Sequence, residues 1–207
     1  MYEKYTIEGD FTMEKLIVAS NNKNKLREFA AIMGSRYEIV SMREAGVESD
    51  IEENGTTFEE NALIKAKYVA AATGCAAIAD DSGLEVDALG GAPGVYSARY
   101  CGRHGDDEAN NDLLLENLKD VPAPRTGRYV AAIALVRPGK EAIIRRGTCD
   151  GEILFERRGT GGFGYDPLFV CETGETFAEV SAETKNAISH RKRGIEAVVR
   201  ALEEEEA

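Results

Sequence analysis

The sequence predicts a single α/β domain in which helices flank a mixed β-sheet. Short apolar runs of strand length alternate along the chain with segments whose apolar residues recur at helical spacing. A length of 207 residues fits one compact domain, and neither an internal repeat nor a low-complexity linker divides it. We therefore expect one domain at residues 15–207, preceded by a polar N-terminal extension at residues 1–14.

The first part of this domain combines short strands with two helices. We expect strands at residues 16–19, 37–41, 76–79 and 84–89, and helices at residues 24–33 and 57–73. Thr57 and Glu60 have the spacing of a capping box at the start of the second helix, and Gly74 follows its last turn. The glycine-rich loop at residues 90–94 then interrupts all periodicity.

The second part begins with a helix and continues mainly in strands. We expect a helix at residues 106–118, hairpin strands at 128–136 and 141–148, further strands at 152–155 and 167–170, and a last helix from about Ser181. The last helix carries an apolar stripe that includes Ile195, Val198 and Leu202. Helices and strands mixed in this way within one domain favour a mixed sheet.

The chain is acidic, with 25 lysines and arginines against 37 aspartates and glutamates and a net charge of −12. A protein that coats a nucleic-acid polymer needs clustered positive charge, so this class of function is disfavoured. An acidic protein that handles a polyanion must do so in one local pocket, where lysine, arginine, backbone N–H groups and a divalent cation outweigh the global charge. We therefore look for such a pocket among the motifs.

Two features of composition bear on the cellular compartment. No apolar run is long enough for a signal peptide or a membrane span, so we expect a cytoplasmic protein that does not act at a membrane. The cysteines at positions 75, 101, 149 and 171 lack the close pairing of zinc sites and of C-x-x-C redox motifs. We expect them to be reduced, partly buried thiols.

The first candidate site is the polar loop between the first strand and the first helix. It presents hydroxyl, amide and ammonium groups at Ser20, Asn21, Asn22, Lys23, Asn24 and Lys25. A helix N-terminus favours an anion through its free N–H groups and its dipole, so this loop is a candidate phosphate site. It lacks the G-x-x-x-x-G-K-[ST] pattern of a P-loop, and the alternative is an ordinary capped helix with exposed lysines.

The second candidate is the run Asp80, Asp81, Ser82 and Gly83, which directly follows an apolar strand. Two adjacent carboxylates there lose solvation and repel one another unless a cation or hydrogen bonds compensate, so one could bind a divalent metal while the other activates water. Adjacent residues of a strand point to opposite faces. The pair therefore serves one site only if the strand ends here and the turn redirects one side chain. The alternative is a polar turn between strands.

An acidic turn at Glu52 and Glu53 precedes the helix that carries Lys65. A Mg²⁺ site needs only one or two protein carboxylates besides water and substrate phosphates, so one of these glutamates together with Asp80 would suffice. Such a turn on its own is usually solvated surface. Its significance depends on its coincidence with the other motifs.

Two further motifs lie closer to the C-terminus. The segment at residues 159–167 is too rich in glycine for a regular element, and its Phe163 offers a stacking face to a base. A flexible hairpin tip is the alternative. The start of the last helix concentrates Lys185, His190 and Arg191, whose donors suit carbonyl and phosphate oxygens, although a lone histidine is more often structural.

Six sequence motifs follow one another along the chain. They are S-x-N-x-x-K at residues 20–25, E-N-G-T-T-F-x-E-N-A at 53–62, A-D-D-S-G-L at 79–84, G-x-x-S-A-R-Y at 94–100, G-G-F-G-Y-D-P at 161–167 and S-H-R at 189–191. In this order and spacing they resemble the pyrophosphatases that hydrolyse non-standard purine nucleoside triphosphates. The similarity extends from about residue 16 to about residue 202, and six ordered motifs are far more specific than any one of them.

The resemblance implies an elongated mixed sheet with flanking helices, two lobes around a nucleotide-binding cleft, a homodimer, and Mg²⁺-dependent release of pyrophosphate from ITP, dITP and XTP. By motif position Asp81 would be the general base, and the metal would be held by Glu53, Asp80 and Asp81. The substrate-binding positions would be Ser20, Asn21, Asn22, Lys23, Asn24, Lys25, Lys65, Ser82, Phe163, Gly164, Tyr165, Asp166, Lys185, His190 and Arg191. The choice of Glu53 over Glu52 follows from the family's E-x-G-x-T-F pattern.

Two other functions fit parts of the same pattern. A non-catalytic nucleotide sensor would use the cationic loops and would not need the aspartate pair. A related pyrophosphatase acting on modified pyrimidine nucleotides would differ in the substrates that it accepts. The sequence does not rank ITP, XTP and dITP as substrates.

Overall fold

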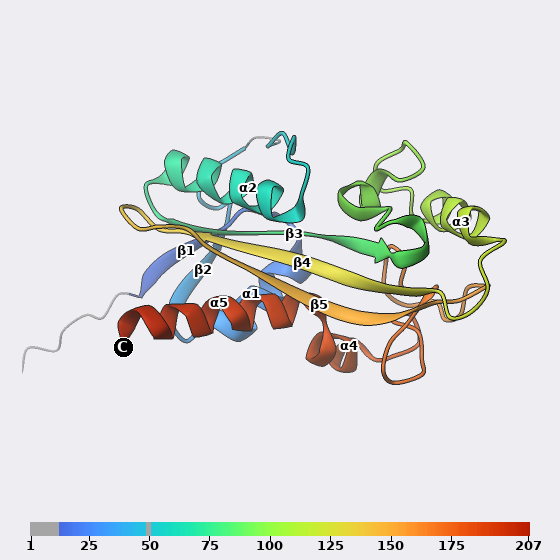
Figure 1. Cartoon of the computed structure of the whole chain (residues 1–207). Coiled ribbons are helices and arrows are strands. Elements are labelled where there is room, and N and C mark those ends of the chain that lie inside the picture. The colour runs from blue at the N-terminus through green and yellow to red at the C-terminus, as the bar shows by residue number, and fades with distance from the viewer. Residues whose placement is uncertain (1–12, 49–50) are drawn as a thin grey trace, which may run out of the picture.

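The chain folds around a six-stranded sheet with the strand order β2-β1-β3-β4-β5-β6 (Figure 1). This computed structural model describes residues 13–48 and 51–207. Its strands are Glu14–Val18 (β1), Tyr37–Ser41 (β2), Ala76–Val86 (β3), Thr126–Val136 (β4), Ile143–Ile153 (β5) and Phe169–Val170 (β6). β1 is parallel to β2 and β3, whereas β3 to β6 are antiparallel neighbours, which confirms the predicted mixed sheet.

Helices cover both faces of this sheet. They are Lys23–Met33 (α1), Phe58–Thr73 (α2), Asp107–Leu118 (α3), Ala182–Ile188 (α4) and His190–Glu206 (α5), with 3-10 helices at Asp87–Leu89 (η1) and Gly94–Arg99 (η2). α2 lies on one face, and α1 and α5 lie on the other (Figure 1). The predicted capping box of Thr57 and Glu60 and the closing Gly74, at φ 68°, are confirmed at the two ends of α2.

Alternation of side chains along β3 divides the core between these two faces. Ala77 and Ala79 pack into the cluster beneath α2, whereas Ala76 and Ile78 pack into the cluster formed with α1 and α5. In the register with β4, residue 80 lies opposite Ile133 of the α5 cluster, and residue 81 lies opposite Ala132 of the α2 cluster. The alternation thus continues without interruption through the two aspartates.

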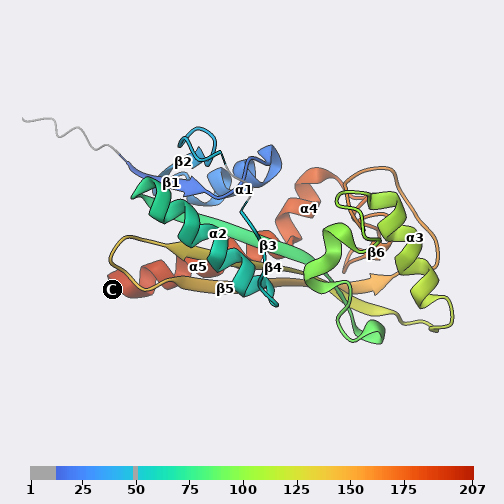
Figure 2. The ribbon, with the colours of Figure 1, turned by 90° about the horizontal axis from the view of Figure 1, so that it is seen from above.

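The far halves of the long strands support a second lobe. Leu84 and Val86 of β3 pack with Leu114 and Leu118 of α3 and with Phe169 of β6 in a third apolar cluster. In Figure 2, α3 and β6 lie at the opposite end of the long strands from β1, β2 and α2. The two lobes therefore share β3, β4 and β5, each of which is 11 residues long.

Three predicted boundaries were wrong. β3 is one strand where two were expected, β5 joins most of two expected strands, and the expected last helix is divided into α4 and α5 at Ser189. β3 continues through its polar residues because β4 pairs with it from Ala77 to Val86. Ser189 has an extended backbone, and its side chain accepts a hydrogen bond from the N–H of Lys192, so it caps a new helix.

Other predictions fall partly outside the described part of the chain or agree with it. Of the expected N-terminal extension, residues 1–12 lie outside the described residues, and β1 already begins at Glu14. All four cysteines are free and at least partly buried, as predicted. No helix in the described ranges has both the length and the apolar character needed to cross a membrane.

α5 packs against β5 with almost no space between the two backbones. A Cβ atom added at Gly147 of β5 would lie 2.2 Å from the carbonyl oxygen of His190 and 2.3 Å from the backbone nitrogen of Gly194. A Cβ added at Gly194 would lie 2.8 Å from Cγ1 of Ile133. Two glycines at this crossing therefore set the depth at which the first turn of α5 lies on the sheet.

We expect Gly147→Ala to lower the free energy of unfolding by about 2–3 kcal/mol, because the new methyl group meets backbone atoms that cannot rotate away. Urea unfolding followed by circular dichroism measures the change. Arg145→Ala, at an exposed position of the same strand, serves as control and should stay within about 0.5 kcal/mol. Equal stability of the two variants would show that α5 is free to shift.

Candidate active site

Within residues 13–48 and 51–207, no strand pairs with one side of β3 over residues 80–83. β1 pairs only with Ala76–Ile78, and contact on that edge resumes where the N–H of Leu84 donates to Oγ of Ser97 at 2.9 Å. On the opposite edge β4 pairs continuously from Ala77 to Val86. Side chains from both faces of β3 can therefore approach one ligand across this open edge.

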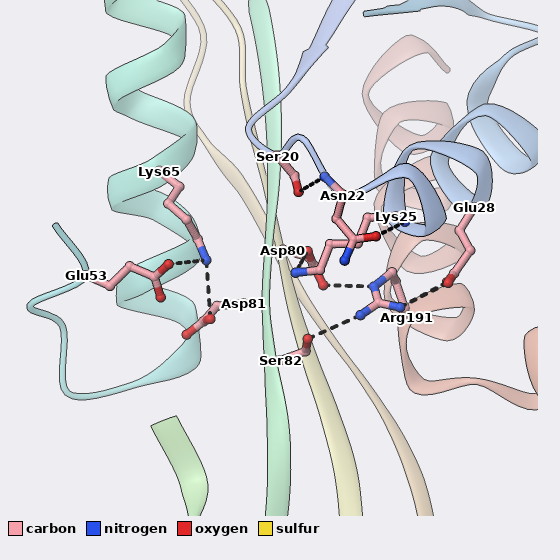
Figure 3. Close-up of polar contacts among 10 residues, drawn as sticks. All are labelled: Ser20, Asn22, Lys25, Glu28, Glu53, Lys65, Asp80, Asp81, Ser82 and Arg191. Atoms are coloured by element: carbon pink, nitrogen blue, oxygen red, sulfur yellow. Dashed lines mark hydrogen bonds and ion pairs between the residues drawn. The ribbon is translucent and has the colours of Figure 1, made fainter. Parts of the chain in front are cut away.

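On the α5 face, Asp80 joins two cations that come from different helices (Figure 3). One carboxylate oxygen lies 2.6 Å from Nζ of Lys25 in α1, and the other accepts a hydrogen bond from Nε of Arg191 in α5 at 2.9 Å. Burial alone would raise the pKa of Asp80, but Lys25 and Arg191 outweigh it and hold the pKa far below its usual range. Asp80 is therefore a charged carboxylate that is fully paired within the protein.

Arg191 is fixed by more than Asp80. Its terminal nitrogens donate to both carboxylate oxygens of Glu28, at 3.1 and 3.3 Å, and to Oγ of Ser82 at 3.3 Å. These acidic partners raise the pKa of Arg191 despite its burial. Because α5 begins at His190, after the Ser189 cap, Arg191 lies in the first helical turn and reaches β3 from there.

On the α2 face, Asp81 belongs to a different group of side chains (Figure 3). Nζ of Lys65 lies 3.3 Å from one oxygen of Asp81 and 3.1 Å from Glu53. Burial, with a contribution from Glu53, raises the pKa of Asp81, although Lys65 and Asn61 oppose the shift. A carboxylate with a raised pKa is a better acceptor for a proton than an ordinary aspartate.

Asn61 connects Asp81 to the loop that carries Glu53. Its Nδ2 donates to Asp81 at 3.1 Å, and its Oδ1 accepts from the N–H of Gly55 at 2.8 Å. The side chain is buried within the α2 face. Sequence reasoning missed this residue, although an amide in helical register with the buried Phe58, Ala62 and Lys65 was a detectable signal.

The condition under which the two aspartates would face one site is not met. No turn redirects either of them, because β3 is continuous, and they project from opposite faces. Within the described ranges, no three His, Cys, Asp or Glu side chains are grouped closely enough to hold a metal ion. Glu53 and Asp81 share a face, and two carboxylates supply enough protein oxygen for Mg²⁺ when water and phosphate complete its coordination. Glu52 and Glu53 are both exposed, and Lys65 contacts Glu53.

A cavity of about 1080 Å³ opens beside Ser82 and Gly83. It is lined by the glycine-rich segment and by α4 and the start of α5, and it includes Phe163, Lys185 and His190. Phe163 is 55% exposed, and Nζ of Lys185 lies 4.4 Å from the centre of its ring. An aromatic face beside a cation, at the mouth of a cavity, suits a planar polar ligand.

Asp166 anchors this side of the cavity. It is buried, accepts hydrogen bonds from the hydroxyl of Tyr129 at 3.1 Å and the N–H of Phe163 at 2.8 Å, and forms an ion pair with Lys185. A Cβ at Gly162 would overlap Asp166, and Gly162 has a positive φ of 74°, so this position requires glycine. Asp166 therefore fixes the conformation of the glycine-rich loop from its buried side.

Residues of α3 fix the same loop within the second lobe. Asp107 accepts a hydrogen bond from the N–H of Gly164 at 2.7 Å, and Asn111 donates to its carbonyl at 2.8 Å. The hydroxyl of Tyr165 donates to the carbonyl of Ser97 at 2.9 Å and is buried. Sequence reasoning missed Asp107, Asn111 and Ser97 as supports of the site, because nothing in the chain pattern shows which helix meets the glycine-rich loop.

The predicted phosphate loop lies at the N-terminus of α1, on the α5 side of β3. Its polar groups are partly used within the loop, since Oγ of Ser20 accepts from the N–H of Asn22 at 3.1 Å. Oδ1 of Asn21 accepts from the N–H of Arg43 at 3.2 Å. Lys23 is exposed, and Lys23 and Asn24 begin α1. Of these residues, Lys25 is the one that reaches Asp80.

His190 forms part of the cavity wall and is 7% exposed. Its ring stacks on Tyr129 with centroids 5.0 Å apart, and Nδ1 is buried with no hydrogen-bond partner among the described residues. Burial lowers the pKa of His190 well below the ordinary value, and the nearby Arg191 and Lys185 add to the effect while Asp80 opposes it. His190 is therefore a neutral imidazole at neutral pH, with one N–H donor to offer a ligand.

Sequence comparisons relate the chain to enzymes. A sequence model of the Ham1 family matches residues 16–201. The chain is 53% identical to the dITP/XTP pyrophosphatase of Geobacter sulfurreducens over 186 residues, which are 88% of this chain and 94% of that protein. It is 50% identical to the dITP/XTP pyrophosphatase of Exiguobacterium sibiricum over 191 residues, 91% of this chain and 96% of that protein.

Comparisons of structure agree. The fold matches the Ham1 protein of Staphylococcus aureus with a TM-score of 0.86 and 41% identity, covering 93% of this chain and 100% of that one. It also matches the nucleoside-triphosphatase / dITP/XTP pyrophosphatase of Mycobacterium abscessus with a TM-score of 0.76 and 46% identity, covering 89% and 98%. The family resemblance read from the six motifs is thereby confirmed.

The neutral state of His190 predicts a pH-dependent loss of stability. Below about pH 6.5 the unfolded chain binds a proton on this ring that the folded protein does not, so stability falls as the pH falls, by up to about 1.4 kcal/mol per pH unit. Between pH 6.5 and 5.5, the free energy of unfolding should fall by about 1 kcal/mol less in the His190→Gln variant than in the unmodified protein.

Urea unfolding at pH 7.5, 6.5 and 5.5 measures this difference. His104→Gln, at an exposed position, controls for the removal of an imidazole as such. Parallel pH profiles for the unmodified protein and the His190 variant would contradict a neutral His190.

Proposed function

The chain belongs to the Ham1 family, and we propose on that premise that it hydrolyses ITP, dITP and XTP to the monophosphate and pyrophosphate in a Mg²⁺-dependent reaction. One observation carries the proposal. At the open edge of β3, Asp81 faces a carboxylate and lysine group, while the adjacent Ser82 lines the large cavity on the other face. A nucleotide lying across this edge would place its phosphates beside Asp81 and Lys65 and its base in the cavity.

The cavity suits a purine with a keto group at position 6. Phe163 offers a stacking face, and His190 and Arg191 offer N–H donors. A keto oxygen accepts from such donors, whereas the amino group of adenine leaves them unpaired in a buried site, which is costly. Asp166 and Lys185 shape the wall beside the ring. The N–H donors therefore select the base, because they would lack an acceptor in a complex with adenine.

The triphosphate would lie between two lysines that approach β3 from opposite faces. Lys25 comes from α1 and Lys65 from α2, and each is already oriented by a carboxylate. The loop of Ser20 to Asn24 adds amides and the N-terminus of α1, which favours anions. Ser82 follows Asp81 in β3, and its Oγ accepts a hydrogen bond from Arg191. Together these groups provide the local positive charge that an acidic protein needs to bind a polyanion.

Asp81 is the group best placed to accept a proton. We assign it the role of general base, which removes a proton from the water that attacks the α-phosphorus. The bond between the α-phosphorus and the bridging oxygen then breaks, and pyrophosphate leaves. Glu53 and Asp81 would hold Mg²⁺, which when bound neutralises charge on the phosphates and on the leaving group. Asn61 keeps the Asp81 carboxylate oriented during proton transfer.

The remaining assignments follow the family resemblance. We propose that the protein acts as a homodimer in the cytoplasm, on free nucleotides and not on a nucleic-acid polymer or at a membrane. The net charge of −12 supports the exclusion of a polymer. Light scattering on the purified protein measures its oligomeric state.

Replacement of Asp81 by Asn tests the general base. We expect kcat for ITP to fall about 10²-fold or more, because the amide accepts no proton from water, while ITP binding remains measurable. Released pyrophosphate and calorimetric titration give the two quantities. Asp120→Asn, at an exposed position of the same residue type, should leave kcat unchanged. Near-normal turnover of the Asp81 variant would refute the assignment.

A panel of nucleoside triphosphates, each with and without Mg²⁺, tests the function itself. We expect pyrophosphate from ITP, dITP and XTP, at least about 10²-fold less from ATP, and none after chelation of the metal. Binding of ITP without pyrophosphate release would instead identify a nucleotide sensor. Turnover confined to modified pyrimidine triphosphates would identify the other class of pyrophosphatase.

A further inference from the structure

Both oxygens of Asp80 are already held by cations. One oxygen contacts Nζ of Lys25 and the other contacts Nε of Arg191, and the carboxylate side chain is 1% exposed. A divalent cation bound to either oxygen would lie directly beside a second positive charge, which repels it. The oxygen donors Glu53 and Asp81 lie on the opposite face of β3. The donor set around Asp80 therefore does not fit a metal site.

What Asp80 does connect are two parts of the substrate site. Lys25 lies in the first turn after the predicted phosphate loop, and its side chain is 23% exposed. Arg191 lines the cavity proposed for the base, with a side chain that is 6% exposed. A single buried carboxylate thus holds a phosphate-side cation and a base-side cation on one face of β3.

The array leaves donors available to a substrate. A guanidinium group has five N–H donors. Arg191 contacts four oxygen atoms, on Asp80, Glu28 and Ser82, so at least one of its N–H groups remains available to a ligand. The ammonium of Lys25 has three donors, and Asp80 takes one. Asp80 and Glu28 therefore orient these cations without consuming their capacity to bind a ligand.

We propose that Asp80 is a positioning residue for substrate selection: it holds Lys25 and Arg191 in one array, so that base and triphosphate are recognised together, and it does not hold the metal. The proposal rests on the proposed function, because it assumes that base and phosphates lie on the two sides of this array. Without the Asp80 charge, two neighbouring buried cations repel each other, and both lose their fixed positions. The phosphates would still attract the freed cations, but Arg191 would no longer be fixed as a donor that distinguishes one base from another.

Asp80→Asn separates this role from metal binding. We expect the ratio of kcat/KM for ITP to that for ATP to fall about 10-fold or more, while the Mg²⁺ concentration for half-maximal activity at saturating ITP stays within about twofold. A rise of about 10-fold in that Mg²⁺ concentration, with an unchanged ratio, would identify a metal ligand and overturn the proposal. An unchanged ratio with unchanged Mg²⁺ dependence would overturn it as well.

A second pair of variants keeps the test valid if Asp80→Asn does not fold. Lys25→Met leaves the Asp80 and Arg191 pair intact, and Lys65→Met makes the same change on the α2 face. Lys65→Met removes a lysine that contacts only phosphate, so it should weaken ITP and ATP equally and leave their ratio unchanged. Lys25→Met frees one oxygen of Asp80, so the carboxylate can turn and Arg191, although still bonded to it, is no longer held in the array; we expect the ITP to ATP ratio to fall severalfold. Equal loss for both nucleotides in the Lys25 variant would overturn the proposal. Failure of the unmodified protein to release pyrophosphate from ITP would refute the proposed function instead.

Discussion

The arrangement of the site depends on one constraint: neighbouring side chains of a continuous β-strand project from opposite faces. Because β4 pairs with β3 along its whole polar segment, Asp80 and Asp81 cannot turn toward each other, and each carboxylate must find its own compensation. Asp80 finds it in Lys25 and Arg191, and Asp81 finds it in Lys65 and Asn61. The open edge of the same strand then allows both groups to serve one ligand.

The same constraint explains how an acidic protein can handle a triphosphate. Lys25, Lys65 and Arg191 are buried or partly buried beside carboxylates from other elements, so their positions are set by the fold before any substrate arrives. Pre-oriented donors lose little conformational entropy when a ligand binds. The carboxylates also prevent these cations from destabilising the free protein by mutual repulsion. The positive charge is thus local and directed, although the protein as a whole is negative.

Much of this could be read from the chain, and the failures have physical reasons. Local patterns predicted the strands, the capped helix α2 and the mixed sheet, because apolar periodicity and capping act over a few residues. The division at Ser189 was missed because an apolar stripe continues across it, whereas the cap is a single side-chain hydrogen bond. The faces of Asp80 and Asp81 depended on whether β4 pairs past them, which is a long-range property. Asp107 and Asn111 lie 57 and 53 residues before Gly164 in the sequence, so their role depends on tertiary packing.

The proposed Mg²⁺ would lie on the α2 face of β3. A crystal structure with Mn²⁺ in place of Mg²⁺ and an α,β-methylene analogue of ITP, with the metal located by its anomalous signal, shows which face holds the metal. We expect an anomalous peak within coordination distance of Glu53 and Asp81, with Lys25 and Arg191 still paired to Asp80. A peak coordinated by the oxygens of Asp80, with Lys25 displaced, would contradict it.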